Sequence, residues 1–118
     1  MMGDRVSIQF QNGTDKSVVL FSHWGGMDEV ALAKSYVRRL KDQFKGSQVL
    51  PLERLEPDIV MVDYIAVNVS KHKTSTGHVM SGYYLAVNSN EGDNYDNGHW
   101  IIDLLTGEAM ASPSGIRL

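Results

Sequence analysis

The spacing of apolar residues changes twice along this 118-residue chain, and that change limits the folds it can adopt. Val6, Ile8 and Phe10 alternate with polar residues, which is the pattern of a strand with one buried side and one solvent-facing side. Across residues 30–44 apolar residues recur every three or four positions, which predicts an amphipathic helix. Alternation returns near residue 83. The sequence therefore predicts an α+β fold.

Turn residues and apolar runs predict the remaining elements. The Asn-Gly turn at residues 12–13 predicts a hairpin into a strand over residues 17–24, which is apolar on both sides. Residues 59–69 fit either a strand or a helix, and the apolar stripe at Val62, Ile65, Ala66 and Val69 favours a helix buried against the sheet. Further strands are predicted over residues 83–88, 100–105 and 109–111.

These elements predict one domain over residues 1–118, with residues 112–118 as a flexible tail. The expected architecture has two or three layers in the order β-β-α-α-β-β, with a short last strand. We expect a largely antiparallel sheet, hairpins at both ends and two helices packed on one face. The second and fourth strands are apolar on both faces, so the other face should be covered by another element or a second subunit. The sequence thus favours a homo-oligomer.

The composition excludes several classes of function. A net charge of −3, from 14 acidic and 11 basic residues, gives no overall positive field, so nucleic acid is not an expected partner. The absence of cysteine removes disulfides, thiolate zinc sites and cysteine nucleophiles. No apolar run reaches the length of a bilayer span, and no signal-like segment opens the chain. We expect a soluble cytoplasmic protein with no membrane partner and no cofactor.

Two histidines at predicted strand ends are the candidate catalytic residues, His23 and His99. Ser22 cannot form a catalytic pair with His23, because neighbouring side chains of a strand point to opposite faces. His99 and Asp103 are four strand steps apart, about 13 Å, which is too far for a hydrogen bond. His23 and His99 would meet only if their two strands were neighbours. Otherwise each histidine closes a sheet end with its ring packed.

The strand-to-helix junction at residues 24–26 combines a tryptophan with two glycines. It lacks the Lys-Ser/Thr of a P-loop, and Asp28 and Glu29 would repel an anion from this helix end. We expect Gly25 and Gly26 to reverse the backbone and Trp24 to pack at the base of the helix, where it is a candidate binding residue.

Residues 88–98 are rich in the oxygen ligands that hard cations prefer. An EF-hand register would put Leu104 where a bidentate glutamate belongs, so only an irregular metal site built from Glu91, Asp93 and Asp96 remains. Asp93 and Asp96 are also candidate binding residues. The same residue types suit any long loop, because they adopt turn and left-handed conformations readily.

Two segments carry a resemblance, residues 17–26 (SVVLFSHWGG) and 96–104 (DNGHWIIDL). They resemble small uncharacterised proteins of archaeal and phage-like genomes, for which the resemblance implies no activity. The order of elements also resembles the layered N-terminal-nucleophile hydrolases. The chain departs from them because no Thr, Ser or Cys stands near its start as a processed nucleophile.

The sequence leaves two functions open. The first is a small binding or assembly module without catalysis, which associates with itself or with an unknown protein partner. The alternative is a hydrolase-like or metal-dependent enzyme whose site is formed by His23 and His99 together with Asp93 and Asp96.

Overall fold

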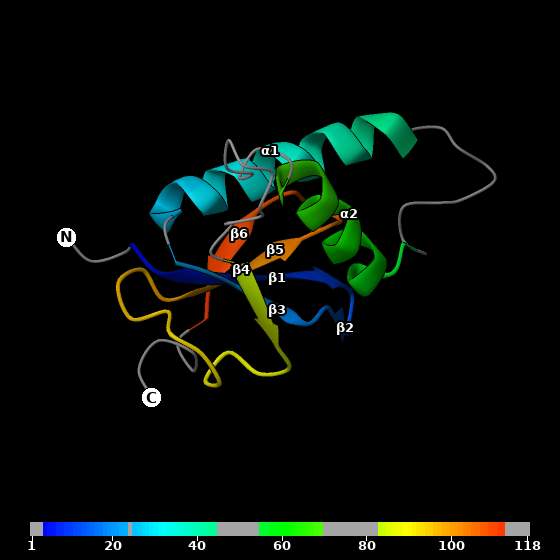
Figure 1. Ribbon diagram of the computed structural model, residues 1–118. Helices are drawn as coiled ribbons and strands as arrows, with labels where there is room; N and C mark the ends of the chain where they lie inside the picture. The colour runs from blue at the N-terminus through cyan, green and yellow to red at the C-terminus, as the bar shows by residue number, and fades with distance from the viewer. Residues whose placement is uncertain (1–3, 24, 45–54, 70–82, 113–118) are drawn as a thin grey trace.

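The computed structural model describes residues 4–23, 25–44, 55–69 and 83–112. Within these residues the chain forms an α+β fold in which both helices lie on one side of a single sheet (Figure 1). The elements in chain order are β1 (Val6–Asn12), β2 (Asp15–Lys16), β3 (Val19–Ser22), α1 (Gly26–Phe44), α2 (Pro57–Val69), β4 (Tyr83–Ala86), β5 (His99–Asp103) and β6 (Ala109–Ala111).

The sheet is mixed, with strand order β4-β3-β1-β5-β6 and with β2 paired to β1. The central strand β1 runs antiparallel to β3 and parallel to β5. The outer strands β4 and β6 pair antiparallel with β3 and β5. Both sides of β1 are therefore occupied by neighbouring strands.

The expected largely antiparallel sheet is confirmed, because among the described strands only β1 and β5 pair in parallel. The expected hairpin between the strands near residues 83 and 100 is wrong. β4 pairs with β3 and β5 pairs with β1, so the two strands lie on opposite sides of β1. The polar segment 87–98 crosses between them instead of closing a hairpin. A strand that is apolar on both faces suits a position inside a sheet, which β5 occupies between β1 and β6. The final hairpin is confirmed, with Gly107 at a φ of 78° in its turn.

The predicted strand over residues 17–24 is observed as the shorter β3, because a local interruption at Ser17 separates β3 from β2. The Ser17 hydroxyl accepts a hydrogen bond from the backbone N–H of Phe10 (2.9 Å). The next backbone N–H, that of Val18, donates to Asp58 Oδ1 of α2 (2.8 Å). Side-chain oxygens thus replace ladder carbonyls at this point, so the regular pairing stops and restarts at Val19.

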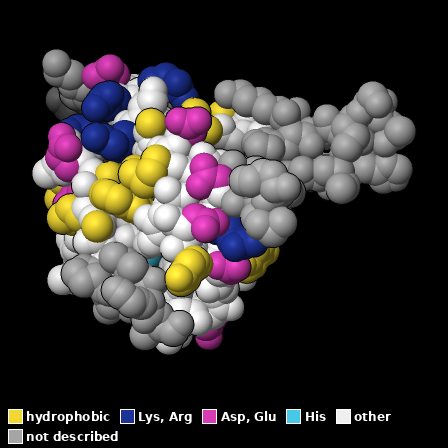
Figure 2. Space-filling model, turned by 90° about the vertical axis from the view of Figure 1, so that its left-hand side faces the viewer, with side chains coloured by type: hydrophobic (Ala, Val, Ile, Leu, Met, Phe, Trp, Pro, Cys, Tyr) yellow, Lys and Arg dark blue, Asp and Glu magenta, His cyan; other side chains and the backbone are white. Residues whose placement is uncertain are grey.

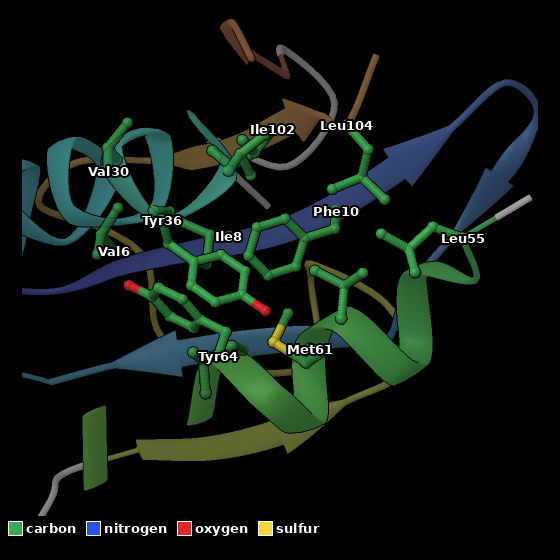
Figure 3. Packing of buried hydrophobic residues seen from close by; sticks show 14 residues of the cluster. Val6, Ile8, Phe10, Val30, Tyr36, Leu55, Met61, Tyr64, Ile102 and Leu104 are labelled. Carbon is green, nitrogen blue, oxygen red and sulfur yellow. The ribbon is translucent and has the colours of Figure 1, made fainter. Parts of the chain in front are cut away.

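The core lies between the sheet and the two helices (Figure 3). The alternating apolar residues of β1 point into it and meet side chains from both helices and β5. The ring centroids of Phe10 and Tyr64 are 5.5 Å apart, and those of Tyr36 and Tyr64 are 5.3 Å apart. Burying each large apolar side chain stabilises the fold by roughly 2 kcal/mol. The contributing residues include Val6, Ile8, Phe10, Leu20, Val30, Val37, Met61, Tyr64 and Ile102.

The helix predicted over residues 59–69 is confirmed as α2, but it presents a different side to the sheet than expected. Val60, Met61 and Tyr64 are buried, whereas Val62 of the predicted stripe is 67% exposed and Ala66 is exposed. α2 is apolar almost all round, so the spacing of its apolar residues does not distinguish its inner from its outer side.

The predicted chain reversal by Gly25 and Gly26 is confirmed. Gly26 has a φ of 55°, in the left-handed region, and its N–H donates to the backbone oxygen of Asp4 (2.8 Å). At Gly25 an added Cβ would lie 2.6 Å from Glu29 Oε1, so a larger residue would push against α1. Trp24, predicted to pack here, lies outside the described residues. Within the described chain, neither helix is long and apolar enough to cross a membrane.

Candidate functional site

The sheet face opposite the helices carries a chain of buried polar side chains. Alternation along β1 places Ser7 and Gln9 on this face, and the parallel register places Ser7 opposite His99. The exposed fractions are 0% for Ser7, 8% for Gln9 and 1% for His99. The prediction that this side of the first strand faces solvent is therefore wrong.

The crossing segment 87–98 accounts for part of this burial. Asn94 is 6% exposed and bonds to Ser7, and the backbone N–H of Ser7 donates to the oxygen of Gly98 (3.1 Å). Gly92 sits directly on the ring of Phe21, where an added Cβ would lie 2.7 Å from a ring carbon. The segment therefore packs on the open face of the sheet as a cover.

The polar side chains form hydrogen bonds that run in one direction. Asn94 Nδ2 donates to Ser7 Oγ (2.9 Å), and Ser7 Oγ donates to His99 Nδ1 (2.7 Å). His99 Nε2 donates to Gln9 Oε1 (2.8 Å), and Gln9 Nε2 donates to the backbone oxygen of Ser17 (2.9 Å). This arrangement assigns the His99 proton to Nε2 of a neutral ring. We call Asn94, Ser7, His99, Gln9 and Ser17 the polar chain.

The environment keeps His99 neutral. Burial, and next the positive charge of Lys16, lower the pKa of His99 from 6.5 to about 4, although hydrogen bonding with the backbone of Ser7 acts in the opposite direction. A second proton on the ring would also leave the Ser7 hydroxyl hydrogen without its acceptor. With both ring nitrogens engaged and such a low pKa, His99 is a weak base at neutral pH.

A pocket of about 680 Å³ lies over one end of this network. Gln9, Ser17 and His99 line its buried floor, and Val19 and Ile101 provide apolar wall. Lys16, Asn88 and Asn90 are exposed at its rim. The polar floor atoms already have partners, since no buried side-chain nitrogen or oxygen in the described residues lacks a hydrogen bond. The pocket therefore has a pre-formed floor and a polar rim.

The predicted acidic ligands have protein partners. Arg5 Nε lies 3.2 Å from Asp93 Oδ2, and Arg5 Nη1 lies 3.7 Å from Asp96 Oδ2. Glu91 Oε1 instead accepts the backbone N–H groups of Val87 and Asn88 (2.9 and 2.8 Å) and closes a turn. Across the part of the chain that the structure describes, no three His, Cys, Asp or Glu side chains are grouped to hold a metal ion.

The surface at this end has mixed charge. Figure 2 shows the side that is on the left in Figure 1, where acidic side chains lie beside basic and apolar ones. The ion pairs of Arg5 with Asp93 and Asp96 join the crossing segment to the residue that precedes β1. These carboxylates therefore fasten the crossing segment to β1.

The two candidate histidines are not on neighbouring strands. β1 lies between β3 and β5, so His23, which follows β3, is two strands from His99, roughly 10 Å away. The expected separation of Ser22 from His23 fits the structure, because the Ser22 hydroxyl is directed to the helix side and donates to Glu29 Oε1 (3.2 Å). In the structure His99 instead bonds to Ser7 and Gln9 of the neighbouring strand β1, two residues that the sequence did not indicate as site residues.

A second buried polar cluster, on the helix side, surrounds Glu29, which is 4% exposed. Besides the bond from Ser22, Glu29 Oε2 accepts hydrogen bonds from the hydroxyls of Tyr83 (2.7 Å) and Tyr64. Burial and the negative charge of Glu29 raise the pKa of both tyrosines, which keeps them protonated as donors. One carboxylate thus joins α1 and α2 to β3 and β4. We call these four residues the Glu29 cluster.

Sequence reasoning missed both clusters. Polar alternation along β1 pointed to Ser7 and Gln9, but the same alternation is typical of a solvent-facing side. Glu29 was interpreted as a first-turn acid, and its hydroxyl donors Tyr64 and Tyr83 are 35 and 54 residues away in sequence. Comparison with family models, curated proteins and solved structures finds no match to this chain.

We predict that His99 makes stability fall as the pH drops from 6.5 to about 4. In this window the unfolded chain binds a proton on His99 while the folded chain does not. The loss approaches roughly 3 kcal/mol once the pH reaches the folded pKa. His99→Gln should lower stability at neutral pH but flatten this dependence, measured by urea unfolding from about pH 7 to about pH 5. Equal slopes for His99→Gln and wild type would contradict the assignment.

We predict that the hydroxyl of Tyr64 contributes more to stability than that of Tyr36. Both rings are buried side by side, but Tyr64 donates to buried Glu29 whereas Tyr36 donates to exposed Asp63 (2.6 Å). Tyr64→Phe removes a donor from a buried carboxylate and should cost about 2 kcal/mol. Tyr36→Phe should cost less than about 1 kcal/mol, because water can replace the donor at Asp63. Thermal and urea unfolding of both variants measure the loss of unfolding free energy. Equal losses would contradict the larger contribution assigned to the Tyr64 hydroxyl in the Glu29 cluster.

Proposed function

We propose that the protein is a small binding module without catalysis, and that its ligand occupies the pocket over His99. The observation that carries this proposal is the pocket itself, whose floor of Gln9, Ser17 and His99 is buried and hydrogen-bonded before any ligand arrives. Its volume of about 680 Å³ is within the range of small-molecule sites, roughly 300–1,000 Å³. A pre-formed floor lowers the entropic cost of binding.

The state of His99 favours binding over catalysis. Its ring is neutral, both nitrogens have protein partners, and its low pKa makes it a poor proton acceptor. Ser7, the hydroxyl that it contacts, is 0% exposed, so a substrate carbonyl has no access to it. The polar chain therefore acts as structural support beneath the pocket.

The residues at the rim of the pocket indicate the chemistry of the ligand. Floor atoms are already paired, so new polar contacts come from the rest of the lining, which includes the exposed side chains of Lys16, Asn88, Asn90 and Asp58. Val19 and Ile101 offer apolar contact beside them. A small, partly apolar molecule with a carboxylate or another acceptor for the Lys16 ammonium suits this combination.

A second candidate function is the hydrolase-like enzyme, and one observation favours it. Ser7 Oγ and His99 Nδ1 are 2.7 Å apart, which is the contact of a nucleophile with its base. This function requires the segment 87–98 to open, because Asn94 covers Ser7. A metal-dependent variant of this function would need ligands beyond the paired Asp93 and Asp96.

We also propose that the protein associates with itself through β4. This strand ends the described sheet, and its Tyr84 and Leu85 are 44% and 53% exposed. The outward backbone groups of an edge strand can pair with the same strand of a second copy, which extends both sheets. Such pairing would also cover the exposed apolar side chains.

We predict that filling the pocket abolishes ligand binding. Amide chemical shifts should be followed while a panel of small carboxylates, amino acids and nucleosides is added. A binding compound should shift Gln9, Ser17 and Asn88, and Ile101→Trp should remove the effect by occupying the pocket. Met110→Trp is the matched control. Met110 lies opposite Ile101 on the neighbouring strand β6 and is 45% exposed, but it does not belong to the described lining of the pocket.

Two outcomes would contradict the binding proposal. One is a set of shifts that maps elsewhere or persists in Ile101→Trp. The other is covalent labelling by a fluorophosphonate serine probe that Ser7→Ala abolishes, since this result would establish the hydrolase-like function instead.

We predict that light scattering finds more than one chain per particle at high concentration, and that Leu85→Lys shifts the protein toward the monomer. A lysine on an edge strand disfavours pairing between copies. Leu105→Lys provides the control, because Leu105 is 41% exposed but lies outside β4. A strictly monomeric wild-type protein would contradict self-association.

A further inference from the structure

We propose that the outer side of α2 docks a basic amphipathic helix of another protein. The starting observation is that α2 is apolar on two sides while only one side packs on the sheet. Ile59 and Val62 are 60% and 67% exposed, and Ala66 continues the same stripe one turn further on. The spacing of three and four residues places these side chains in one line along the helix. Large apolar side chains aligned on a surface are typical of an interaction site.

The stripe lies in a shallow groove with acidic edges. A hollow of about 440 Å³ is lined by Asp58, Ile59, Val62, Asp63 and Ala66. Asp58 and Asp63 are the only charged residues of α2, which contains no lysine or arginine. The groove therefore offers an apolar floor and negative charge, and its complement is an apolar stripe flanked by Lys or Arg.

The two carboxylates are positioned before a partner binds. Asp58 Oδ1 accepts the backbone N–H of Val18 (2.8 Å), and Asp63 Oδ2 accepts the hydroxyl of Tyr36 (2.6 Å). Each carboxylate keeps a second oxygen, which can accept a hydrogen bond from a lysine or arginine of the partner. Fixed acceptors at the edges of an apolar groove select the partner by charge.

The α2 helix of a second copy is a poorer occupant of this groove. Packing α2 against α2 would bring Asp58 and Asp63 of both copies around one apolar seam, with no basic residue from either helix between them. Like charges at close range oppose such an interface. This docking site is thus separate from the β4 edge, and it does not rest on the binding pocket proposed above.

The test uses two designed peptides and the full-length protein. Both peptides form amphipathic helices of about 18 residues with the same leucine stripe, one flanked by Lys and Arg and the other by Glu. Fluorescence anisotropy should show that the basic peptide binds at least about tenfold more tightly than the acidic one, and that added salt reduces the difference.

Variants then locate the site. Val62→Arg should weaken binding of the basic peptide by at least about tenfold, because it removes an apolar contact and adds a like charge. Asp63→Asn should reduce the preference for the basic peptide over the acidic one. Met110→Ser, an exposed apolar residue on β6, should leave both affinities unchanged. Thermal unfolding verifies that the exposed Val62 variant is folded.

Three results would overturn the proposal. Equal affinity for the two peptides would show that charge does not select the partner. Binding unaffected by Val62→Arg would place the contact elsewhere. A change from oligomer to monomer on Val62→Arg, detected by light scattering, would identify a second copy of the chain as the occupant.

Discussion

The parallel pairing of β1 with β5 is the interaction on which the rest of this structure depends. It places β1 at the centre of the sheet, where the helix-side residues enter the core and the opposite-side residues meet β5. It sets His99 against Ser7 and leaves β4 on the far side of the sheet. The segment 87–98 must then cross the open face, where Asn94 completes the polar chain. A hairpin between β4 and β5 would have produced none of these contacts.

Both faces of the sheet bury polar side chains, and the hydrogen bonds that satisfy these side chains differ between the two faces. Buried polar groups are costly unless they are hydrogen-bonded. On the open face, the neutral ring of His99 accepts a hydrogen bond from Ser7 and donates one to Gln9. On the helix face, the Glu29 carboxylate accepts hydrogen bonds from hydroxyl groups of three other elements. Both clusters join segments distant in sequence, so they hold the strands and helices in a single arrangement.

The periodicity of apolar residues predicted both described helices and most strand positions, and the turn residues predicted the antiparallel pairing of β1 with β3 and of β5 with β6. The pairings of β5 with β1 and of β4 with β3 were not predicted. Residues 59–69 were correctly assigned to a helix, yet the buried side was misplaced because α2 is apolar nearly all round. His99 was a candidate site residue, and the structure places it in the floor of the pocket. Ser7 and Gln9 were missed, because alternation with apolar residues is also the pattern of a solvent-facing side.

The amino-acid sequence by itself determined the α+β class, the order of its elements and the glycine-dependent turn into α1. These features depend on backbone geometry and on side chains within a few residues of one another. Only the tertiary structure decided that β5 lies parallel to β1, that Glu29 is buried and that Ile59 and Val62 are exposed. These outcomes depend on contacts between segments tens of residues apart, whose free energies are summed over the whole fold and leave no local pattern.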